Sequence, residues 1–139
     1  MTPVKANLSA FRNIFRFNSR APRSEFWWVT ATLFGGVVLA TIIDMAVFDE
    51  GRTYPAVYTV ATIMFIVFYA TYILVTISVT IRRLHDMDMS GWFALLFFLG
   101  GLGFIILAII CSRQGTFGPN RFGPDPTYKE DGWEADIFG

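Results

Sequence analysis

The densest group of side chains that could do chemistry is the segment Arg82–Asp88, which contains two arginines, one histidine and two aspartates. An imidazole titrates near neutral pH, and Asp86 or Asp88 could orient the ring of His85. Such a group could bind an anion at a membrane surface or move a proton for a bound substrate. The plainer interpretation is a turn whose arginines pair with its aspartates.

The sequence contains no recognisable metal or cofactor site. It has a single histidine and a single cysteine, Cys111, and one imidazole beside two aspartates does not match the spacing of zinc ligands. Neither a glycine-rich phosphate loop, a nucleophile elbow nor a nucleic-acid-binding motif is present. We therefore expect no metal, no cofactor and no nucleic-acid partner, and we expect Cys111 to be a small buried apolar residue.

A second polar group lies just before the first long apolar stretch. Arg20, Arg23 and Glu25 follow one another closely there, on the same predicted side of the membrane as the segment Arg82–Asp88. Arginine pairs readily with carboxylates in a planar, two-bond geometry. We predict that these residues, together with Asp86 and Asp88, form one polar cluster within salt-bridge distance.

Three apolar runs must position these groups, at residues 26–48, 56–81 and 92–111. Hydrophobic residues make up 54% of the 139 residues and charged residues only 16%, against about 25% in soluble domains. About 20 helical residues cross a hydrocarbon core of about 30 Å, so each run is long enough. The sequence predicts an all-α polytopic membrane protein, with three transmembrane helices in a single membrane domain at residues 1–126.

The segments that flank the apolar runs have their own signatures. Leu8, Phe11 and Phe15 share one helical face with arginines beside it, which predicts a short interfacial helix before the first run. The stretch 115–126 is rich in Gly and Pro and predicts an irregular tail of fixed turns. Residues 127–139 are acidic, and we expect them to be disordered.

The distribution of basic residues predicts the orientation. The first 25 residues contain five Lys and Arg against one acidic residue, so we expect the N-terminus in the cytoplasm. Three full crossings would then leave the tail outside, which is the topology we expect. The glycines of residues 100–103 offer an alternative, a re-entrant hairpin that returns the tail, with Arg113 and Arg121, to the cytoplasm.

Two further patterns concern helix packing. Small residues recur at a spacing of four in the first run (Thr32, Gly36, Ala40), which predicts close contact with another span or a second copy. Hydroxyl-bearing residues fall on one side of the second run. They are Tyr58, Thr62, Tyr69, Tyr72, Thr76 and Thr80. This stripe favours hydrogen bonding between helices, with a polar transport path as the alternative.

Three motifs together resemble a known family. They are Phe17–Trp28, the segment Arg82–Asp86 with Ser90–Trp92, and the tail Gly115–Pro126. In this order, over residues 11–126, they resemble the bacterial inner-membrane family of domain of unknown function 805, the YhaH-like proteins.

The resemblance implies a small inner-membrane protein without an established activity or cofactor. It implies that the arginines, His85, Asp86 and the pair Asn120–Arg121 matter together, which would place the tail on their side of the membrane. Asn18 departs from the family, where glycine is usual, and Gly100 and Gly101 stand where a proline-containing break is expected.

We therefore expect a non-enzymatic module of the bacterial inner membrane whose cytoplasmic cluster binds a protein partner or anionic lipid. The candidate binding residues are Arg20, Arg23, Glu25, Arg82, Arg83, His85, Asp86, Asn120 and Arg121. The alternative is a small oligomeric transporter or channel, with the hydroxyl face of the second span lining the path. An enzyme that uses His85 and Asp86 has the least support, because no nucleophile or metal set accompanies them.

Overall fold

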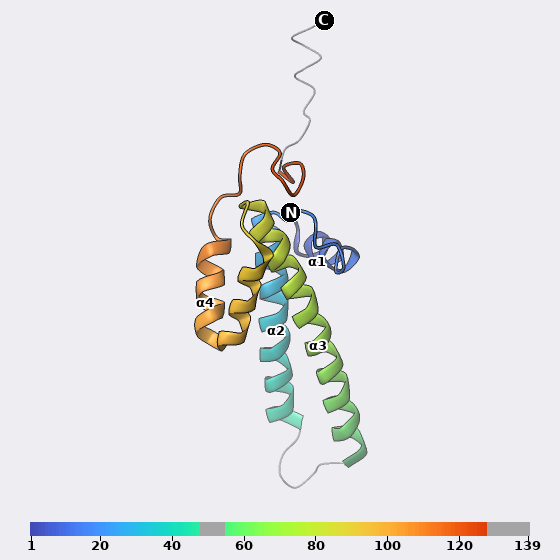
Figure 1. The fold of residues 1–139 in the computed structure, drawn as a ribbon. Helices are drawn as coiled ribbons and strands as arrows, with labels where there is room; N and C mark the ends of the chain where they lie inside the picture. Colours follow the sequence, from blue (N-terminus) through green and yellow to red (C-terminus); the bar gives the residue numbers. More distant parts are fainter. Residues whose placement is uncertain (48–54, 128–139) are drawn as a thin grey trace, which may run out of the picture.

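The computed structural model describes residues 1–47 and 55–127, and its regular elements in these ranges are all helical (Figure 1). They are α1 (Pro3–Arg12), α2 (Arg23–Val47), α3 (Pro55–Asp86), the 3-10 helix η1 (Gly91–Leu99) and α4 (Gly100–Cys111). Three helical stretches are long and apolar enough to cross a membrane, namely Arg23–Ala46, Thr59–Asp86 and Gly91–Cys111. The predicted all-α class is confirmed. The expected disorder of residues 127–139 falls almost entirely outside the described residues.

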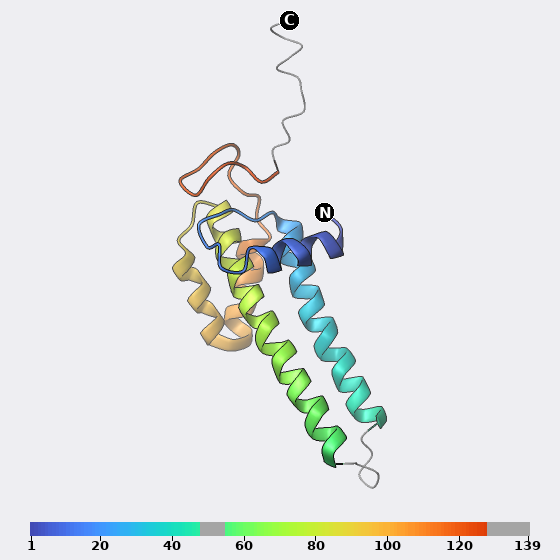
Figure 2. The same cartoon turned by 90° about the vertical axis from the view of Figure 1, so that its right-hand side faces the viewer.

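Helices α2 and α3 run antiparallel, side by side, through most of the length of the molecule (Figures 1 and 2). A Cβ added at Gly36 would lie 2.6 Å from the Phe68 ring, so the predicted contact of the small-residue face with another span is confirmed there. The buried core gathers at one end of the pair, where Phe26 and Val29 join Val75 and Val79. Toward the other end, the large apolar side chains are exposed, as a lipid surround requires.

The third apolar run folds into a hairpin made of η1 and α4 (Figures 1 and 2). Gly100 joins the arms with φ 62° and ψ −137°, a conformation that glycine alone adopts readily. Gly103 lets the arms touch, because a Cβ there would overlap the carbonyl group of Leu96. Nine residues of 3-10 helix and twelve of α-helix both measure roughly 18 Å, so the arms match in length.

The two ends of this hairpin contact the same end of α3. At its start, a Cβ on Gly91 would lie 3.1 Å from Nε2 of His85. At its end, Nε of Arg83 donates to the carbonyl of Cys111 at 3.0 Å. A straight 21-residue helix would separate these ends by about 30 Å, which excludes both contacts at once. The expected full crossing of the third run, with the tail on the far side, is therefore corrected to the hairpin alternative.

The hairpin gathers three segments at one end of the molecule, and we call them the polar cap: residues 13–25, 82–90 and 112–127. Helix α1 lies across α2 and α3 beside this cap (Figure 2). Its Ala6 and Ala10 are buried against the spans, whereas Val4 and Leu8 are exposed. The predicted short N-terminal helix is confirmed, but it ends at Arg12, so Phe15, which the sequence placed on its apolar face, lies beyond its end.

Substitution of Gly103 by alanine should destabilise the hairpin. The new Cβ would meet the backbone of Leu96, which cannot rotate away as a side chain could, and overpacking costs about 1–3 kcal/mol or more. Gly101→Ala is the matched control, because a Cβ there meets nothing within 4 Å. Thermal unfolding in detergent should show a lower midpoint for Gly103→Ala alone, and equal midpoints would contradict the close approach of the arms.

Residues before and after the spans should be accessible from the same side of the membrane. In a chain with Cys111 replaced by alanine, Lys5→Cys and Gln114→Cys both place a thiol at an exposed position. A membrane-impermeant maleimide should label both in the same preparation, either intact cells or inverted vesicles. Labelling of the two positions from opposite sides would contradict the hairpin and show that the third run crosses the membrane.

Candidate functional site

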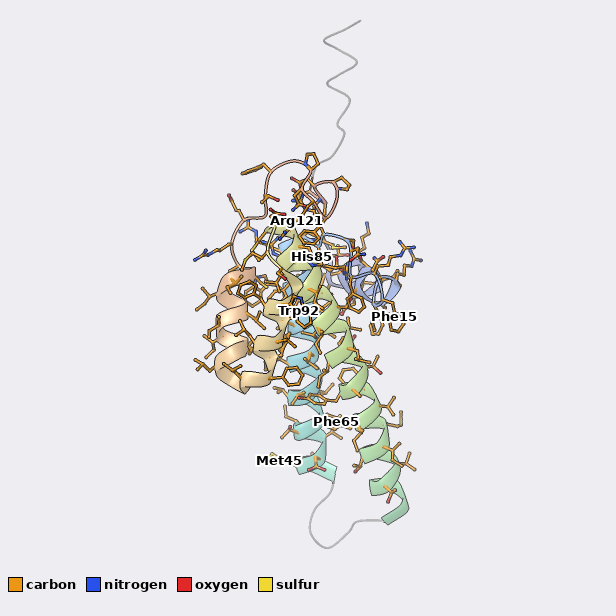
Figure 3. The ribbon with its side chains drawn as sticks, viewed as in Figure 1. Phe15, Met45, Phe65, His85, Trp92 and Arg121 are labelled. Carbon is orange, nitrogen blue, oxygen red and sulfur yellow. The ribbon has the colours of Figure 1, made fainter. Side chains whose placement is uncertain are left out.

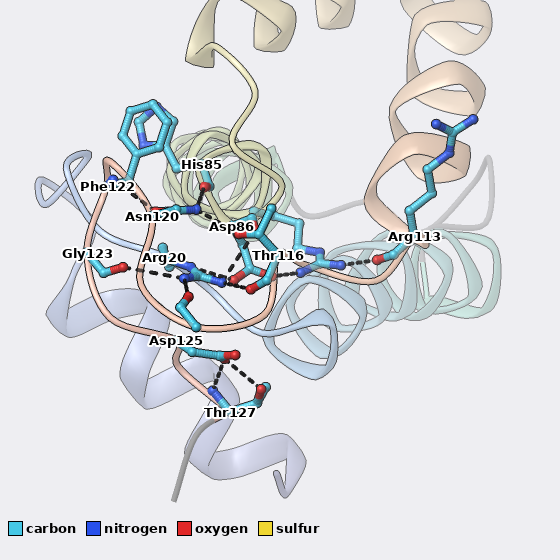
Figure 4. Close-up of polar contacts among 12 residues, drawn as sticks. Arg20, His85, Asp86, Arg113, Thr116, Asn120, Phe122, Gly123, Asp125 and Thr127 are labelled. Carbon is cyan, nitrogen blue, oxygen red and sulfur yellow. Dashed lines mark hydrogen bonds and ion pairs between the residues drawn. The ribbon is translucent and has the colours of Figure 1, made fainter.

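Asp86, at the end of α3, is the centre of a buried ion-pair network (Figure 4). Its Oδ1 accepts a hydrogen bond of 2.8 Å from Nε of Arg20, and its Oδ2 accepts one from Nη1 of Arg83. The side chains of both arginines are only 1% exposed. Gly115 passes so close that a Cβ there would overlap the carboxylate. One carboxylate therefore links the linker before α2, the end of α3 and the tail.

A second buried ion pair joins the start of α2 to the end of α3. Nη2 of Arg82 donates to Oε1 of Glu25 at 2.8 Å, with both side chains at most 3% exposed. Successive residues of a helix point about 100° apart. Arg82 can therefore face α2 while Arg83 faces the tail. The backbone N–H of Ala21 also donates to the carbonyl of Arg82, at 3.2 Å.

The remaining donors of Arg20 and Arg83 hold the end of α4 and the irregular tail that follows it. Arg20 donates to the carbonyls of Thr116 and Gly118 at 2.5 and 2.6 Å. Arg83 donates to the carbonyls of Cys111 and Arg113. A segment without regular structure must find partners for its backbone carbonyls, and here guanidinium groups supply them.

The tail in turn caps the C-terminus of α3, whose last carbonyls have no partner within the helix. The backbone N–H and the hydroxyl of Thr116 donate to the carbonyl of Asp86 at 2.9 and 3.0 Å. Nδ2 of Asn120 donates to the carbonyl of His85 at 2.9 Å. Farther along, the Thr127 hydroxyl and N–H both donate to Asp125, and these bonds lower the pKa of that carboxyl.

Comparison with known proteins identifies the family. The family described as "Protein of unknown function (DUF805)" matches residues 14–124, a range that includes every residue of the buried network. The chain belongs to this family.

Two relatives from Escherichia coli strain K12 match nearly the whole chain. The inner membrane protein YhaI is 34% identical over 124 residues, covering 87% of this chain and 94% of its own length. The inner membrane protein YhaH is 33% identical over 121 residues, covering 86% and 93%. No solved structure matches the chain. As a member of the DUF805 family with three membrane-length helical stretches, the chain is an integral membrane protein.

His85 belongs to a stack at the side of the cap. Its ring lies parallel to the ring of Phe122, with centroids 3.8 Å apart and planes inclined by 4°. The guanidinium carbon of Arg121 lies 4.7 Å from the centre of the same Phe122 ring. Arg121 also pairs with Asp88 at 3.0 Å, and both of these side chains are about half exposed. In the described part of the chain, no hydrogen bond joins the His85 ring to a carboxylate.

The structure brings together most of the residues that the sequence singled out. The predicted polar cluster is confirmed for Arg20, Glu25 and Asp86 with the two consecutive arginines of α3. Arg23 is exposed, and within the described residues it donates to the carbonyl of Ser112, at 3.2 Å, and forms no ion pair. Asp88 pairs with Arg121 outside the buried network. Whether any of these residues binds a partner stays a prediction.

Sequence reasoning missed the residues whose backbone is the partner. Thr116 contributes its carbonyl, N–H and hydroxyl, and Cys111 contributes its carbonyl. Backbone partners leave no trace in residue types, so only the family motif of the tail could have pointed to Thr116. Among residues 1–47 and 55–127, no group of three or more His, Cys, Asp or Glu is arranged to hold a metal ion.

The hydroxyl stripe of the second span is partly buried within one chain. Thr76 and Thr80 are at most 3% exposed, and their hydroxyls donate at 2.7 Å to carbonyls of their own helix. The ring of Tyr72 packs edge-on against Phe11 at 5.4 Å. Tyr69 is exposed, and the side chain of Tyr58 falls outside the described residues. For Thr76 and Thr80, the expected hydrogen bonds between helices are therefore corrected to bonds within α3.

Asp86→Asn should destabilise the polar cap strongly. The substitution leaves two buried guanidinium groups without their counter-charge, which typically costs about 3–5 kcal/mol. Asp88→Asn removes the same charge from an exposed pair and should cost at most about 1 kcal/mol. Denaturant or thermal unfolding in the same detergent compares the two. Similar losses would mean that the network at Asp86 does not hold the cap together.

Proposed function

We propose that this protein is a non-enzymatic module of the bacterial inner membrane that binds anionic phospholipid through its polar cap, with both the N-terminus and the tail in the cytoplasm. The observation behind it is the separation of buried from exposed charge. The buried carboxylates of the cap are each paired with buried arginines. Among residues 1–47 and 55–127, exposed basic side chains outnumber acidic ones around them. They are Lys5, Arg12, Arg16, Arg23, Arg113 and Arg121, against the exposed Asp88 and the half-buried Asp125.

The hairpin topology supports the cytoplasmic placement. Of the 11 Lys and Arg, all except Arg52 and Lys129 lie in α1 or the polar cap. The opposite end of α2 has the exposed Asp44 instead. Basic residues concentrate on the cytoplasmic side of membrane proteins. A straight third span would have placed Arg113 and Arg121 outside, against the rule that basic residues concentrate on the cytoplasmic side. The hairpin removes this conflict.

Lipid is favoured over a protein partner because interfacial features surround the exposed arginines. Trp27, Trp28 and Trp92 are 44%, 39% and 78% exposed at the cap ends of α2 and η1. Tryptophan is enriched where acyl chains meet head groups. Helix α1 adds exposed Leu8 at the same level, with Phe15 just beyond its end. Each basic residue near an anionic surface contributes about 1 kcal/mol of attraction.

The structure also decides which arginines can test this function. The guanidinium groups of Arg82 and Arg83 are buried and bonded to protein groups, so charge reversal there would break the cap. Exposed Arg12, Arg16 and Arg113 are the informative positions.

The combined variant Arg12→Gln, Arg16→Gln, Arg113→Gln should lose most of the preference for anionic lipid. Each removed charge weakens it by up to about fivefold, following from about 1 kcal/mol per residue. The measurement is quenching of tryptophan fluorescence by brominated phosphatidylglycerol against brominated phosphatidylcholine in vesicles.

The matched control replaces the same three arginines by lysine, which keeps the charge and should keep most of the preference. High salt should weaken the preference of the wild type through screening. An unchanged preference in the glutamine variant would overturn the proposal. Labelling of Gln114→Cys in inverted vesicles but not in intact cells would support the cytoplasmic placement, and the reverse would contradict it.

A further inference from the structure

A groove of about 940 Å³ lies between the α2–α3 pair and the hairpin. Leu33 and Phe34 of α2, Ile73 and Ile77 of α3, and Phe97 of η1 contribute apolar lining. The hairpin turn forms the end of the groove away from the cap. There the centroids of the Phe34 and Phe104 rings lie 5.4 Å apart. The volume is at the upper end of the range for ligand sites, about 300–1,000 Å³.

The groove has a polar mouth at the cap. Asn18, His85, Ser90 and Arg121 line that end, together with Phe122. In Figure 3, Arg121, His85 and Trp92 follow one another from the cap down along the helices. Arg121 is 58% exposed and its only ion-pair partner in the described residues is the half-exposed Asp88. An exposed pair of this kind contributes little to stability, so a phosphate can replace the carboxylate at low cost.

We propose that this groove holds one phospholipid per chain as a specific ligand, with an acyl chain along the apolar lining and the phosphate at Arg121. The inference rests on the proposed function, because the same basic cap attracts the head group, and it adds a discrete site for that lipid. Asn18 and Ser90 supply neutral hydrogen-bonding groups beside the phosphate.

Charge and position together specify this occupant. The lining belongs to membrane-length helices, so acyl chains are the molecules that surround it. Lipid tails are as apolar as leucine, so a chain alone gains little by leaving the bilayer for the groove. Retention must therefore come from the head group at the mouth. An anionic lipid with its phosphate at Arg121 meets both requirements at once.

The experiment is native mass spectrometry of the full-length protein loaded with phosphatidylglycerol. At activation energies that strip surrounding lipid, the wild type should retain one lipid per chain. Ile77→Trp fills the groove from α3, and Gly101→Leu fills it from the hairpin, where an added Cβ has open space. Each should lower the retained fraction at least tenfold. Leu74→Trp, at an exposed position of α3 outside the groove, should retain the lipid.

The head-group contact is tested with a matched pair of variants. Arg121→Gln should lower retention, whereas Arg121→Lys keeps the positive charge at the groove mouth and should retain most of the lipid. Glycerol phosphate, which has the head-group chemistry without a chain, should not compete. Competition by it would identify a soluble phosphate site and overturn the lipid proposal.

Retention of the lipid in both groove-filling variants would overturn the inference, as would a wild type that retains none or that carries a second copy of the chain there. None of these outcomes tests the broader function, which is measured separately by the quenching of tryptophan fluorescence by surrounding lipid. If the quenching preference disappears from the wild type while one lipid is still retained, the proposed function fails and the groove site stands.

Discussion

A buried guanidinium group must keep a counter-charge, because its charge cannot be neutralised by losing a proton. Three such groups, from Arg20, Arg82 and Arg83, meet two carboxylates at the polar end of this protein. The carboxylates balance two of the three positive charges, and the backbone carbonyls of Cys111, Thr116 and Gly118 accept further hydrogen bonds from Arg20 and Arg83. The irregular tail is therefore ordered by charge, in a region where it has no helix or strand to satisfy its backbone.

The same requirement links the cap to the path of the chain through the membrane. Arg83 can reach the carbonyls of Cys111 and Arg113, at the end of α4, only if the third apolar segment returns to the end where it began. Gly100 allows the reversal and Gly103 allows the arms to touch. The hairpin thus places the basic residues of the tail at the same end of the molecule as those of α1 and α3. The concentration of basic residues on one side of the membrane and the buried ion pairs of the cap both favour the hairpin topology.

The hairpin also creates the groove, because its two short arms cover only the cap half of the α2–α3 pair. The groove therefore has apolar walls on membrane-length helices and a polar mouth at the cap, the two parts that a phospholipid would need. The proposed function and the proposed lipid site both draw on this geometry, in which the ion pairs of Arg20, Arg82 and Arg83 are buried and exposed arginines such as Arg121 remain at the rim.

The sequence by itself determined the membrane class, the three apolar helical stretches, the α1 helix and the membership of Arg20, Glu25, Arg82, Arg83 and Asp86 in one cluster. Run length and charge position are local properties, so they can be read without a structure. Only the tertiary structure decided that the third run turns back, since hydropathy measures how long a segment is and not where its ends go. It also decided that Asp86 pairs with Arg20, which is 66 residues away in the sequence, and that Asp88 pairs with Arg121. Such pairings depend on distances in space, and the backbone carbonyls that complete them are the same in every residue type.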